Sequence, residues 1–336
     1  MRCTEFVQTR TLPSRRVSYR KEFGLDSQGR SKVVPAEAQG LTLPKISIIT
    51  PSYNQAHYIE QTILSVLQQN YENLEFIIID GGSTDASVDV IRKYESQLHY
   101  WISEKDRGQA HALNKGLEQA TGEIVAYLNS DDLYLPGAFA AVVSYFQEHP
   151  ECEWVCGDTL MFGEQRDDEV VRADVPRSAA QALSWAYTAP QPGMFWKREL
   201  LHEGFAERWR YCFDHELYVR LLLAGHTCEH LPLTLAAYRL HTASKTVAEG
   251  DLFDREFDQI AEIYEPRLRG SGRRWCAATR LLRESFAASQ TGRRGAAATK
   301  LFHALLLHPE GIAARPFWGC FRRLLQARPE NVKTQA

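Results

Sequence analysis

Three short apolar runs, separated by segments with helical spacing, constrain the fold of this chain more than any other feature. The runs are residues 45–51, 74–80 and 123–128. Between the first two, residues 55–69 place apolar side chains three and four positions apart, as one face of a helix does. Such runs are typical of strands buried on both faces, and strand–helix alternation requires a parallel sheet covered by helices. The sequence therefore predicts an α/β protein with a mostly parallel central sheet.

The chain divides into three parts by composition. Residues 1–44 show no sustained period and are predicted to form an N-terminal extension, residues 45–250 form the α/β domain, and residues 251–336 read as helices only. Residues 265–336 hold 14 Lys and Arg against 4 Asp and Glu, although the whole chain has a net charge of -3. This basic tail favours contact with an anionic membrane surface, and a solvated helical face would give the same composition.

Several protein classes are disfavoured. No run of 18 or more uncharged apolar residues predicts a membrane-spanning helix, and the first residues are polar and arginine-rich, unlike a secretion signal. The seven cysteines are scattered and include no Cys-x-x-Cys pair, which favours reduced thiols over a disulfide frame or a zinc site. We expect a cytoplasmic protein that reaches the inner face of the cell membrane through its tail and has no nucleic-acid partner.

Two adjacent acids, Asp131 and Asp132, follow the third apolar run, and Pro136 then opens a segment with helical spacing. Carboxylates at the carboxyl end of a central strand lie where open α/β sheets bind their ligands. Hard divalent cations prefer such oxygen ligands, with substrate phosphates completing the shell. The same pair would also serve as a helix N-cap with an extra surface acid.

Polar loops also follow the first two runs. Residues 50–54, Thr-Pro-Ser-Tyr-Asn, offer small hydroxyls and an aromatic ring that could hold a nucleotide base and ribose. After the second run, Gly81 and Gly82 let the backbone approach a ligand, and Asp80 could accept a hydrogen bond from it. The same residues also make an ordinary turn. Neither loop has the glycine pattern of a dinucleotide-binding or P-loop protein, so NAD binding and ATP hydrolysis are disfavoured.

Two further segments place charged side chains beside helix starts. Asp106, Asn114 and Lys115 lie in residues 103–116, where they could recognise a sugar and its diphosphate or serve only as caps. Asp214 heads a predicted helix, and the macrodipole favours a carboxylate there. It is either a capping acid or a general base at the rim of a cleft.

Together these segments resemble the family 2 glycosyltransferases, a group of inverting enzymes with the GT-A fold. The resemblance is strong over residues 45–160 and moderate over residues 185–245. Each matching segment is modest by itself, and their order and spacing make the match specific. In chain order they are ISIITPSYNQAHYIEQTILSVLQQNY, FIIIDGGSTDAS, SEKDRGQAHALNKGL, GEIVAYLNSDDLYLPGA, QPGMFWKREL, FDHELYVRL and YRLHTASKT. The resemblance implies a Rossmann-like GT-A domain, here followed by a helical appendage.

The resemblance also implies a nucleotide-diphosphate sugar as donor, Mn²⁺ or Mg²⁺ as cofactor, and a saccharide or lipid-linked acceptor. It assigns a divalent cation to Asp132 with His241, the general base to Asp214, and the acceptor side to Gln191 and Arg220. His241 also fits a histidine of the core. The positions that match the donor site are Thr50, Pro51, Ser52, Tyr53, Asp80, Ser83, Asp85, Asp106, Asn114, Lys115 and Asp131.

His111 departs from the family pattern, because many relatives carry an acid at this position. The departure affects the predicted donor contact and the identity of the sugar.

Two other functions remain open. A sugar nucleotidyltransferase shares the sheet, but it is expected to carry a glycine-rich basic loop after the first strand, and residues 51–54 are not one. A catalytically silent sugar-nucleotide-binding subunit would not need the intact acids. We therefore expect a metal-assisted, inverting glycosyltransferase of polysaccharide or glycolipid assembly.

Overall fold

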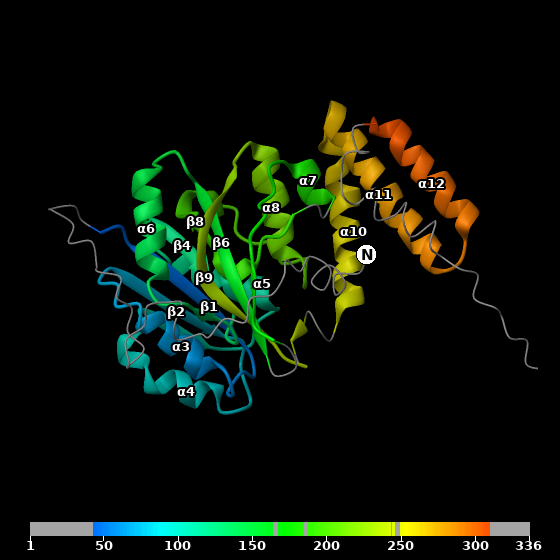
Figure 1. The fold of residues 1–336 in the computed structure, drawn as a ribbon. Helices are drawn as coiled ribbons and strands as arrows, with labels where there is room; N and C mark the ends of the chain where they lie inside the picture. Colours follow the sequence, from blue (N-terminus) through cyan, green and yellow to red (C-terminus); the bar gives the residue numbers. More distant parts are fainter. Residues whose placement is uncertain (1–42, 164–166, 185–186, 243, 246–248, 310–336) are drawn as a thin grey trace, which may run out of the picture. The chain divides into compact units, whose positions relative to one another are not determined.

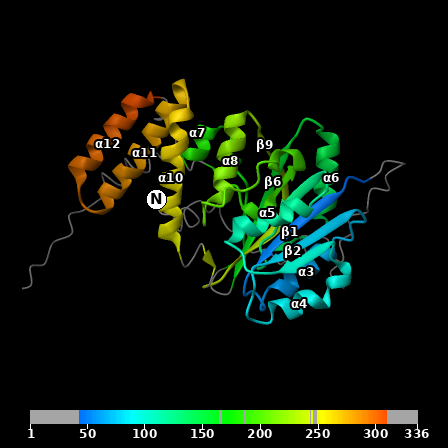
Figure 2. The ribbon, with the colours of Figure 1, turned by 180° about the vertical axis from the view of Figure 1, so that it is seen from behind.

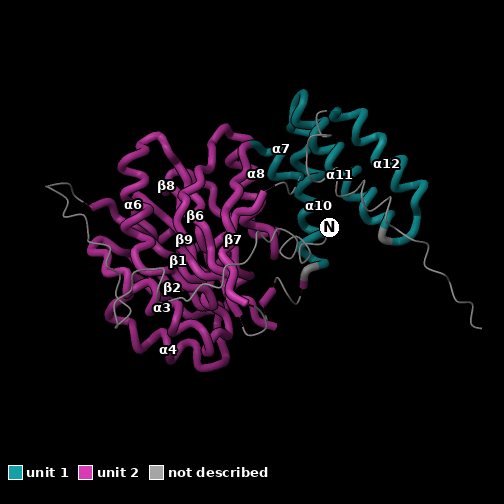
Figure 3. Tube along the Cα trace, in the orientation of Figure 1, with its two compact units in different colours: residues 1–10, 178–186, 250–336 teal, residues 11–177, 187–249 magenta. Residues whose placement is uncertain are grey.

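The structure is a computed structural model that describes residues 43–163, 167–184, 187–242, 244–245 and 249–309. The described chain forms two compact units, coloured separately in Figure 3. Of the described residues, the α/β unit contains those from 43 to 177 and from 187 to 249, and the helical unit contains 178–184 and 250–309. The predicted extension lies almost entirely outside the described residues.

The α/β unit is built on a nine-stranded sheet with the order β3-β2-β1-β4-β8-β6-β9-β5, in which β7 pairs with β6. Its first half is parallel: β1 (Ile46–Ser52) pairs with β2 (Leu74–Asp80) and β4 (Ile124–Tyr127), and β2 pairs with β3 (Tyr100–Ser103). The three apolar runs are therefore strands, and the predicted α/β class with parallel pairing is confirmed.

The second half of the sheet is mixed. β8 (Met194–Lys197) is antiparallel to β4 and to β6 (Trp154–Gly163), and β9 (Cys228–Leu240) is parallel to β6. The short strands β5 (Leu133–Tyr134) and β7 (Glu169–Val171) are antiparallel to β9 and β6. Because β5 directly follows the acid pair, its pairing with β9 brings the end of β9 beside those acids.

Helices cover both faces of the sheet. Helices α3 (Ile59–Leu67), α4 (Ser87–Lys93) and α6 (Ala138–Glu148) lie on one face, and α5 (Gln109–Gln119) lies on the other (Figures 1 and 2). The first face buries Ile46, Ile48, Phe76 and Ile78 of the strands against Ile59, Ile63, Phe139 and Val142 of the helices. Each fully buried isoleucine of this kind contributes about 1.5–3 kcal/mol relative to an exposed one.

The remaining elements of the α/β unit are shorter, apart from helix α8. Helix α8 spans Phe213–Ala224 and ends at Gly225, whose φ of 100° lies in the left-handed region. The turns are the 3₁₀ helices η1 (Glu95–Gln97), η2 (Gln191–Gly193) and η3 (Arg198–Leu201). The described cysteines of this unit, Cys152, Cys156, Cys212 and Cys228, are buried and form no disulfide.

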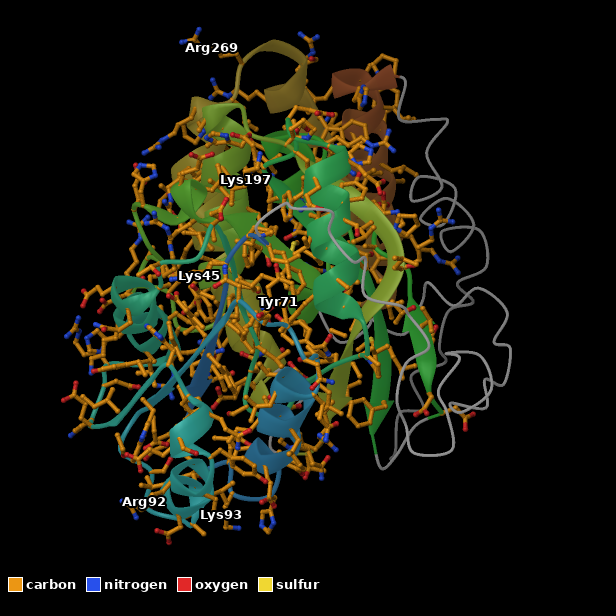
Figure 4. The ribbon with its side chains drawn as sticks, turned by 90° about the vertical axis from the view of Figure 1, so that its left-hand side faces the viewer. Lys45, Tyr71, Arg92, Lys93, Lys197 and Arg269 are labelled. Atoms are coloured by element: carbon orange, nitrogen blue, oxygen red, sulfur yellow. The ribbon has the colours of Figure 1, made fainter. Side chains whose placement is uncertain are left out.

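At the amino-terminal edge of the sheet, Glu75 joins three segments. Its carboxylate accepts hydrogen bonds from Ser47 Oγ (2.7 Å), from the Thr121 N–H (2.8 Å) and from Lys45 Nζ (2.9 Å). Lys45 is labelled in Figure 4, beside the start of β1. Burial would raise the pKa of Glu75, but the hydrogen bonds from Ser47, Thr121 and Lys45 outweigh it and lower the pKa to about 2.

The helical unit consists of α7 (Ala179–Leu183), α10 (Gly250–Tyr264), η4 (Glu265–Arg267), α11 (Gly270–Gln290) and α12 (Arg294–Leu307). Helices α11 and α12 pack through the apolar residues Leu282, Phe286, Leu301 and Leu305. The sequence predicted helices here but did not place α7 with them. Residues 310–336, the last part of the region predicted to be helical, lie outside the described residues.

None of the described helices combines the length and the apolar character needed to cross a membrane. The basic charge of the helical unit is partly balanced within it, because Arg280 pairs with Glu265 and Lys300 pairs with Glu284.

Candidate active site at the carboxyl edge of the sheet

The loops after β1 and β2 are locked together by side-chain hydrogen bonds. The Asn54 N–H donates to Ser83 Oγ (2.7 Å), and the Ala56 N–H donates to Asp85 Oδ2 (3.0 Å). Asn54 adopts a φ of 53°, a left-handed conformation that asparagine tolerates. Ser83 and Asp85, predicted donor-site residues, thus hold the loop that presents Tyr53, whose side chain is 60% exposed.

Asp80 is buried at the end of β2 and is already saturated with hydrogen bonds. Its Oδ2 accepts from the Gly82 N–H (3.1 Å), the Ser83 N–H (2.8 Å) and Ser103 Oγ (2.7 Å). Its Oδ1 accepts from Ser83 Oγ at 2.5 Å. The carboxylate therefore shapes the loop in this structure, and direct contact of Asp80 with a nucleotide stays a prediction.

The hydroxyls of Thr50 and Ser52 are buried at the end of β1 and have no hydrogen-bond partner among the described residues. Between them, Pro51 pairs with Ile79 of β2 and is also buried. A buried polar group left without a partner costs about 1–3 kcal/mol, and contact of these two hydroxyls with a nucleotide stays a prediction.

The loop after β3 reaches the loop after β2 through Asp106. A Cβ atom at Gly81 would lie only 2.6 Å from Asp106 Oδ2, so a side chain there would push this carboxylate away. Asp106 Oδ1 accepts from the Gly108 N–H at 2.8 Å, immediately before α5. The structure thus brings Asp106 against the predicted nucleotide loop.

Asn114 and Lys115 of α5 are engaged with other parts of the protein. Asn114 makes two hydrogen bonds with the backbone of Phe205, at 2.9 and 2.8 Å, and Lys115 Nζ lies 2.6 Å from Glu104 Oε1. His111, the unusual residue of this segment, accepts the Arg107 N–H at its Nδ1 (3.2 Å). These side chains brace the loops around the site, and their predicted contact with the donor stays a prediction.

Asp131 and His241 meet although 110 positions separate them in the chain. His241 Nε2 lies 3.0 Å from Asp131 Oδ2, and the two side chains are 8% and 18% exposed. The His241 ring packs on the Tyr58 ring, with their centroids 4.7 Å apart. The pairing of β5 with β9 positions both residues at the same edge of the sheet.

Asp132 has a different environment from its neighbour. It is fully buried, its Oδ1 accepts the Arg239 N–H (2.8 Å), and its Oδ2 accepts from Asn129 Nδ2 (3.3 Å). Burial, and then the nearby Asp131 carboxylate, raise the pKa of Asp132 well above its ordinary value. Asp132 therefore anchors the end of β9, two residues before His241.

A chain of amide groups crosses the centre of the site. Gln109 Nε2 donates to Asn129 Oδ1 (2.7 Å), and Lys245 Nζ donates to Gln109 Oε1 (2.8 Å). On the other side, Gln191 Nε2 donates to the Tyr127 carbonyl (2.8 Å). Of these side chains, only Gln191 was predicted from the sequence. Asn129 lies two residues before Asp131, and this position beside the acid pair could have identified it from the sequence.

Asp214 lies in the first turn of α8, where its Oδ1 accepts the His215 N–H at 2.7 Å. Two buried tyrosines lie close to it: burial, and then the Asp214 carboxylate, raise the pKa values of Tyr127 and Tyr218 well above their ordinary value. The Asp132 carboxylate raises the pKa of Tyr127 further, after Asp214.

Arg220, the other residue predicted for the acceptor side, braces the loop before α8. Its guanidinium donates to Glu203 Oε2 (2.8 Å) and to the Gly204 carbonyl (2.7 Å). Contact of Arg220 with an acceptor stays a prediction. Among the described residues there is no group of three or more His, Cys, Asp and Glu arranged to hold a metal ion.

Comparison with known proteins supports one family. The family model described as glycosyl transferase family 2 matches residues 47–181. An uncharacterized glycosyltransferase of Mycobacterium tuberculosis is 31% identical over 198 residues, which cover 57% of this chain and 72% of that protein. The putative teichuronic acid biosynthesis glycosyltransferase TuaG of Bacillus subtilis is 47% identical over 121 residues, 35% of this chain and 48% of TuaG.

Other matches are partial or distant. An uncharacterized glycosyltransferase from a Nostoc strain is 30% identical over 60% of this chain, and the chain spans 66% of its length. Among solved structures, Staphylococcus aureus TarS residues 1–349 in complex with UDP-GlcNAc superimposes with a TM-score of 0.58 at 18% identity, over 84% of this chain and 90% of that one. At that identity the likeness shows the shared fold. The sequence matches and the fold together establish that this chain belongs to glycosyl transferase family 2.

Proposed function

We propose that this protein transfers a sugar from a nucleotide-diphosphate donor to a hydroxyl acceptor, with a divalent cation and with inversion at the anomeric carbon. The observation that carries the proposal is the Asp131–His241 contact of 3.0 Å at the carboxyl edge of the parallel strands. Open α/β sheets bind ligands at this edge. The exposed Tyr53 ring and the unpartnered hydroxyls of Thr50 and Ser52 lie at the same edge and suit a nucleoside.

The pair formed by Asp131 and His241 fits a divalent cation better than Asp132 does. It presents a carboxylate oxygen and an imidazole nitrogen, whereas the oxygens of the fully buried Asp132 accept hydrogen bonds from Arg239 and Asn129. Mg²⁺ and Mn²⁺ are commonly held by one or two protein ligands together with substrate phosphates. We therefore propose Asp131 in place of Asp132 as the direct ligand. When bound, the cation would offset charge on the leaving diphosphate.

Asp214 is proposed as the general base. In the transfer, the acceptor oxygen forms a bond to the anomeric carbon while the bond from that carbon to the diphosphate oxygen breaks. The nucleoside diphosphate leaves with the bonding electron pair, and the acceptor proton passes to the Asp214 carboxylate. Attack from the side opposite the leaving group inverts the configuration, so no nucleophile from the protein is required.

The setting is proposed to be polysaccharide or glycolipid assembly, with a saccharide or lipid-linked acceptor. TuaG, the relative of highest identity among those compared above, carries a name from teichuronic acid biosynthesis. We also propose a peripheral contact of the helical unit with an anionic membrane at the inner face of the cell membrane. On α12, Phe302 and Leu306 are 59% and 63% exposed, one turn apart. Residues 285–309 contain basic residues but no acid.

A thermal-shift panel tests the site directly. The probes are nucleoside diphosphates and their sugars, beginning with UDP-GlcNAc, each with and without Mn²⁺. A ligand at 100 times its dissociation constant stabilises the folded protein by about 2.7 kcal/mol, which is readily detected. We expect one nucleotide to give a shift that depends on Mn²⁺. No such shift with any nucleotide would favour the silent-subunit alternative.

Two matched variants test the metal assignment in the same panel. In Asp131→Asn the Mn²⁺-dependent part of the shift should disappear, because the charged oxygen ligand is lost. In Asp132→Asn it should remain, because the amide oxygen can still accept the Arg239 N–H. If the Mn²⁺-dependent shift instead remains in Asp131→Asn and disappears in Asp132→Asn, Asp132 is the cation ligand.

A further inference from the structure

We propose that Lys245 is a catalytic residue of this site, whose ammonium group binds the donor diphosphate and stabilises the nucleoside diphosphate as it leaves. The inference rests on the proposed transfer reaction. Neither the sequence motifs nor the family match assigns a role to this residue.

Hydrogen bonds connect Lys245 to the acid pair. Its Nζ donates to Gln109 Oε1 at 2.8 Å, Gln109 Nε2 donates to Asn129 Oδ1 at 2.7 Å, and Asn129 Nδ2 lies 3.3 Å from Asp132 Oδ2. Two side chains, those of Gln109 and Asn129, therefore link the ammonium group to Asp132. The hydrogen-bonded chain thus ends at Asp132, the neighbour of the proposed cation ligand Asp131.

The same hydrogen bond places Lys245 at the start of α5. Gln109 is the first residue of this helix, and its first turn contains no acid, although the Asp106 carboxylate accepts the Gly108 N–H directly before it. Unpaired N–H groups at a helix start attract anions, and an adjacent ammonium group strengthens that attraction. Lys245 and α5 thus present positive charge from two different elements toward one place.

The charge of Lys245 is left for a ligand, unlike other cations around the site. Lys115 pairs with Glu104, Arg107 pairs with Glu207 and Arg220 pairs with Glu203. Within the part of the chain that the structure describes, no carboxylate lies within 4.0 Å of Lys245 Nζ, and its hydrogen-bond partner is the neutral Gln109 amide. The residue is exposed, so a ligand can reach it.

Charged groups of the candidate site act on the Lys245 ammonium group. Protein around the ammonium group, and then the Arg210 guanidinium, lower the pKa of Lys245, while Glu249, Asp131 and Asp106 act in the opposite direction. Lys245 is thus within electrostatic reach of Asp131, the proposed cation ligand, and of Asp106, which lies against the predicted nucleotide loop.

This position suits the charge that develops in the reaction. As the bond to the anomeric carbon breaks, negative charge grows on the diphosphate oxygen that leaves. A preorganised cation near that oxygen stabilises the transition state more than the ground state, because the charge is largest there. Loss of Lys245 should therefore lower kcat as well as weaken donor binding.

The test compares nucleoside diphosphates with the matching monophosphates in the full-length protein with Mn²⁺. The probes are UDP and UMP, GDP and GMP, and the variants are Lys245→Gln and Lys245→Arg. Lys245→Gln should weaken diphosphate binding by about 10- to 100-fold, the effect of losing a hydrogen bond to a charged group, and should leave monophosphate binding nearly unchanged. Lys245→Arg should recover most of the diphosphate affinity.

Lys93→Gln is the matched control, since it removes the same charge from an exposed lysine at the end of α4 (Figure 4). It should bind both nucleotides as the wild type does. Equal diphosphate affinities in wild type and Lys245→Gln would overturn the role of Lys245 and leave the proposed function standing. Absence of nucleotide binding in the wild type would instead overturn the proposed function, so the two failures are distinguishable.

Discussion

At the scale of single residues, neighbours in the sequence of this site perform different tasks. Asp131 faces His241, while Asp132 is buried and holds the end of β9. Asp80 resembles Asp132 in this respect, because its oxygens accept hydrogen bonds from the protein and so shape the neighbouring loop. Sequence patterns identify such acids but do not distinguish a ligand from an anchor. That distinction depends on the burial and hydrogen bonds that only the fold provides.

A single buried acid at the opposite edge of the sheet predicts the acid sensitivity of the fold. Glu75 has a pKa of about 2 in the folded protein, against an ordinary value of 4.5. The unfolded chain therefore binds the proton more tightly, and stability falls as the pH decreases from about 4.5 toward 2. With about 1.4 kcal/mol per pKa unit, this carboxylate contributes on the order of 3 kcal/mol above that range.

The measurement is urea unfolding of the wild type and of Glu75→Gln at pH 7, 4.5 and 3. Glu75→Gln should be less stable at pH 7 and should lose less stability on acidification than the wild type. Glu118→Gln, at an exposed position of α5, is the matched control and should follow the wild type. Identical pH profiles for wild type and Glu75→Gln would show that this carboxylate does not carry the effect.

At the scale of elements, the two halves of the sheet contribute different parts of the site. The parallel strands β1, β2 and β4 present the loops that carry Tyr53, Asp80 and Asp131. The mixed half adds His241 through β9 and Gln191 through η2. The apolar runs predicted the first half because buried parallel strands are continuously hydrophobic. The second half was less predictable, because its strands include short ones whose partners are distant in sequence.

Helix α12 carries a prediction of its own. If Phe302 and Leu306 insert into a membrane surface, the double variant Phe302→Gln, Leu306→Gln should bind phosphatidylserine-containing vesicles at least about tenfold more weakly, since each buried apolar side chain contributes about 1.5–3 kcal/mol. Co-sedimentation at low salt measures this. Leu233→Gln changes an apolar residue of β9 that is 49% exposed and serves as the control. Unchanged binding of the double variant would exclude α12 as the contact.

At the scale of the whole molecule, the sequence predicted the α/β class, the family and the helical character of the region after residue 250. It did not predict that α7, from residues 179–183, belongs with the helical unit. It also did not predict the amide chain through Gln109 and Asn129 or the position of Lys245. Single polar residues of this kind have no periodicity and acquire meaning only when several loops are brought to one edge of the sheet.

If Asp214 is the base of the proposed transfer, removing its charge should slow the chemical step and spare donor binding. Transfer by Asp214→Asn should be slower by roughly 10²–10⁴, because the amide cannot accept the proton, while nucleotide affinity stays near that of the wild type. Asp89→Asn, at an exposed acid of α4, should retain full activity. Full transfer activity in Asp214→Asn would rule out Asp214 as the base.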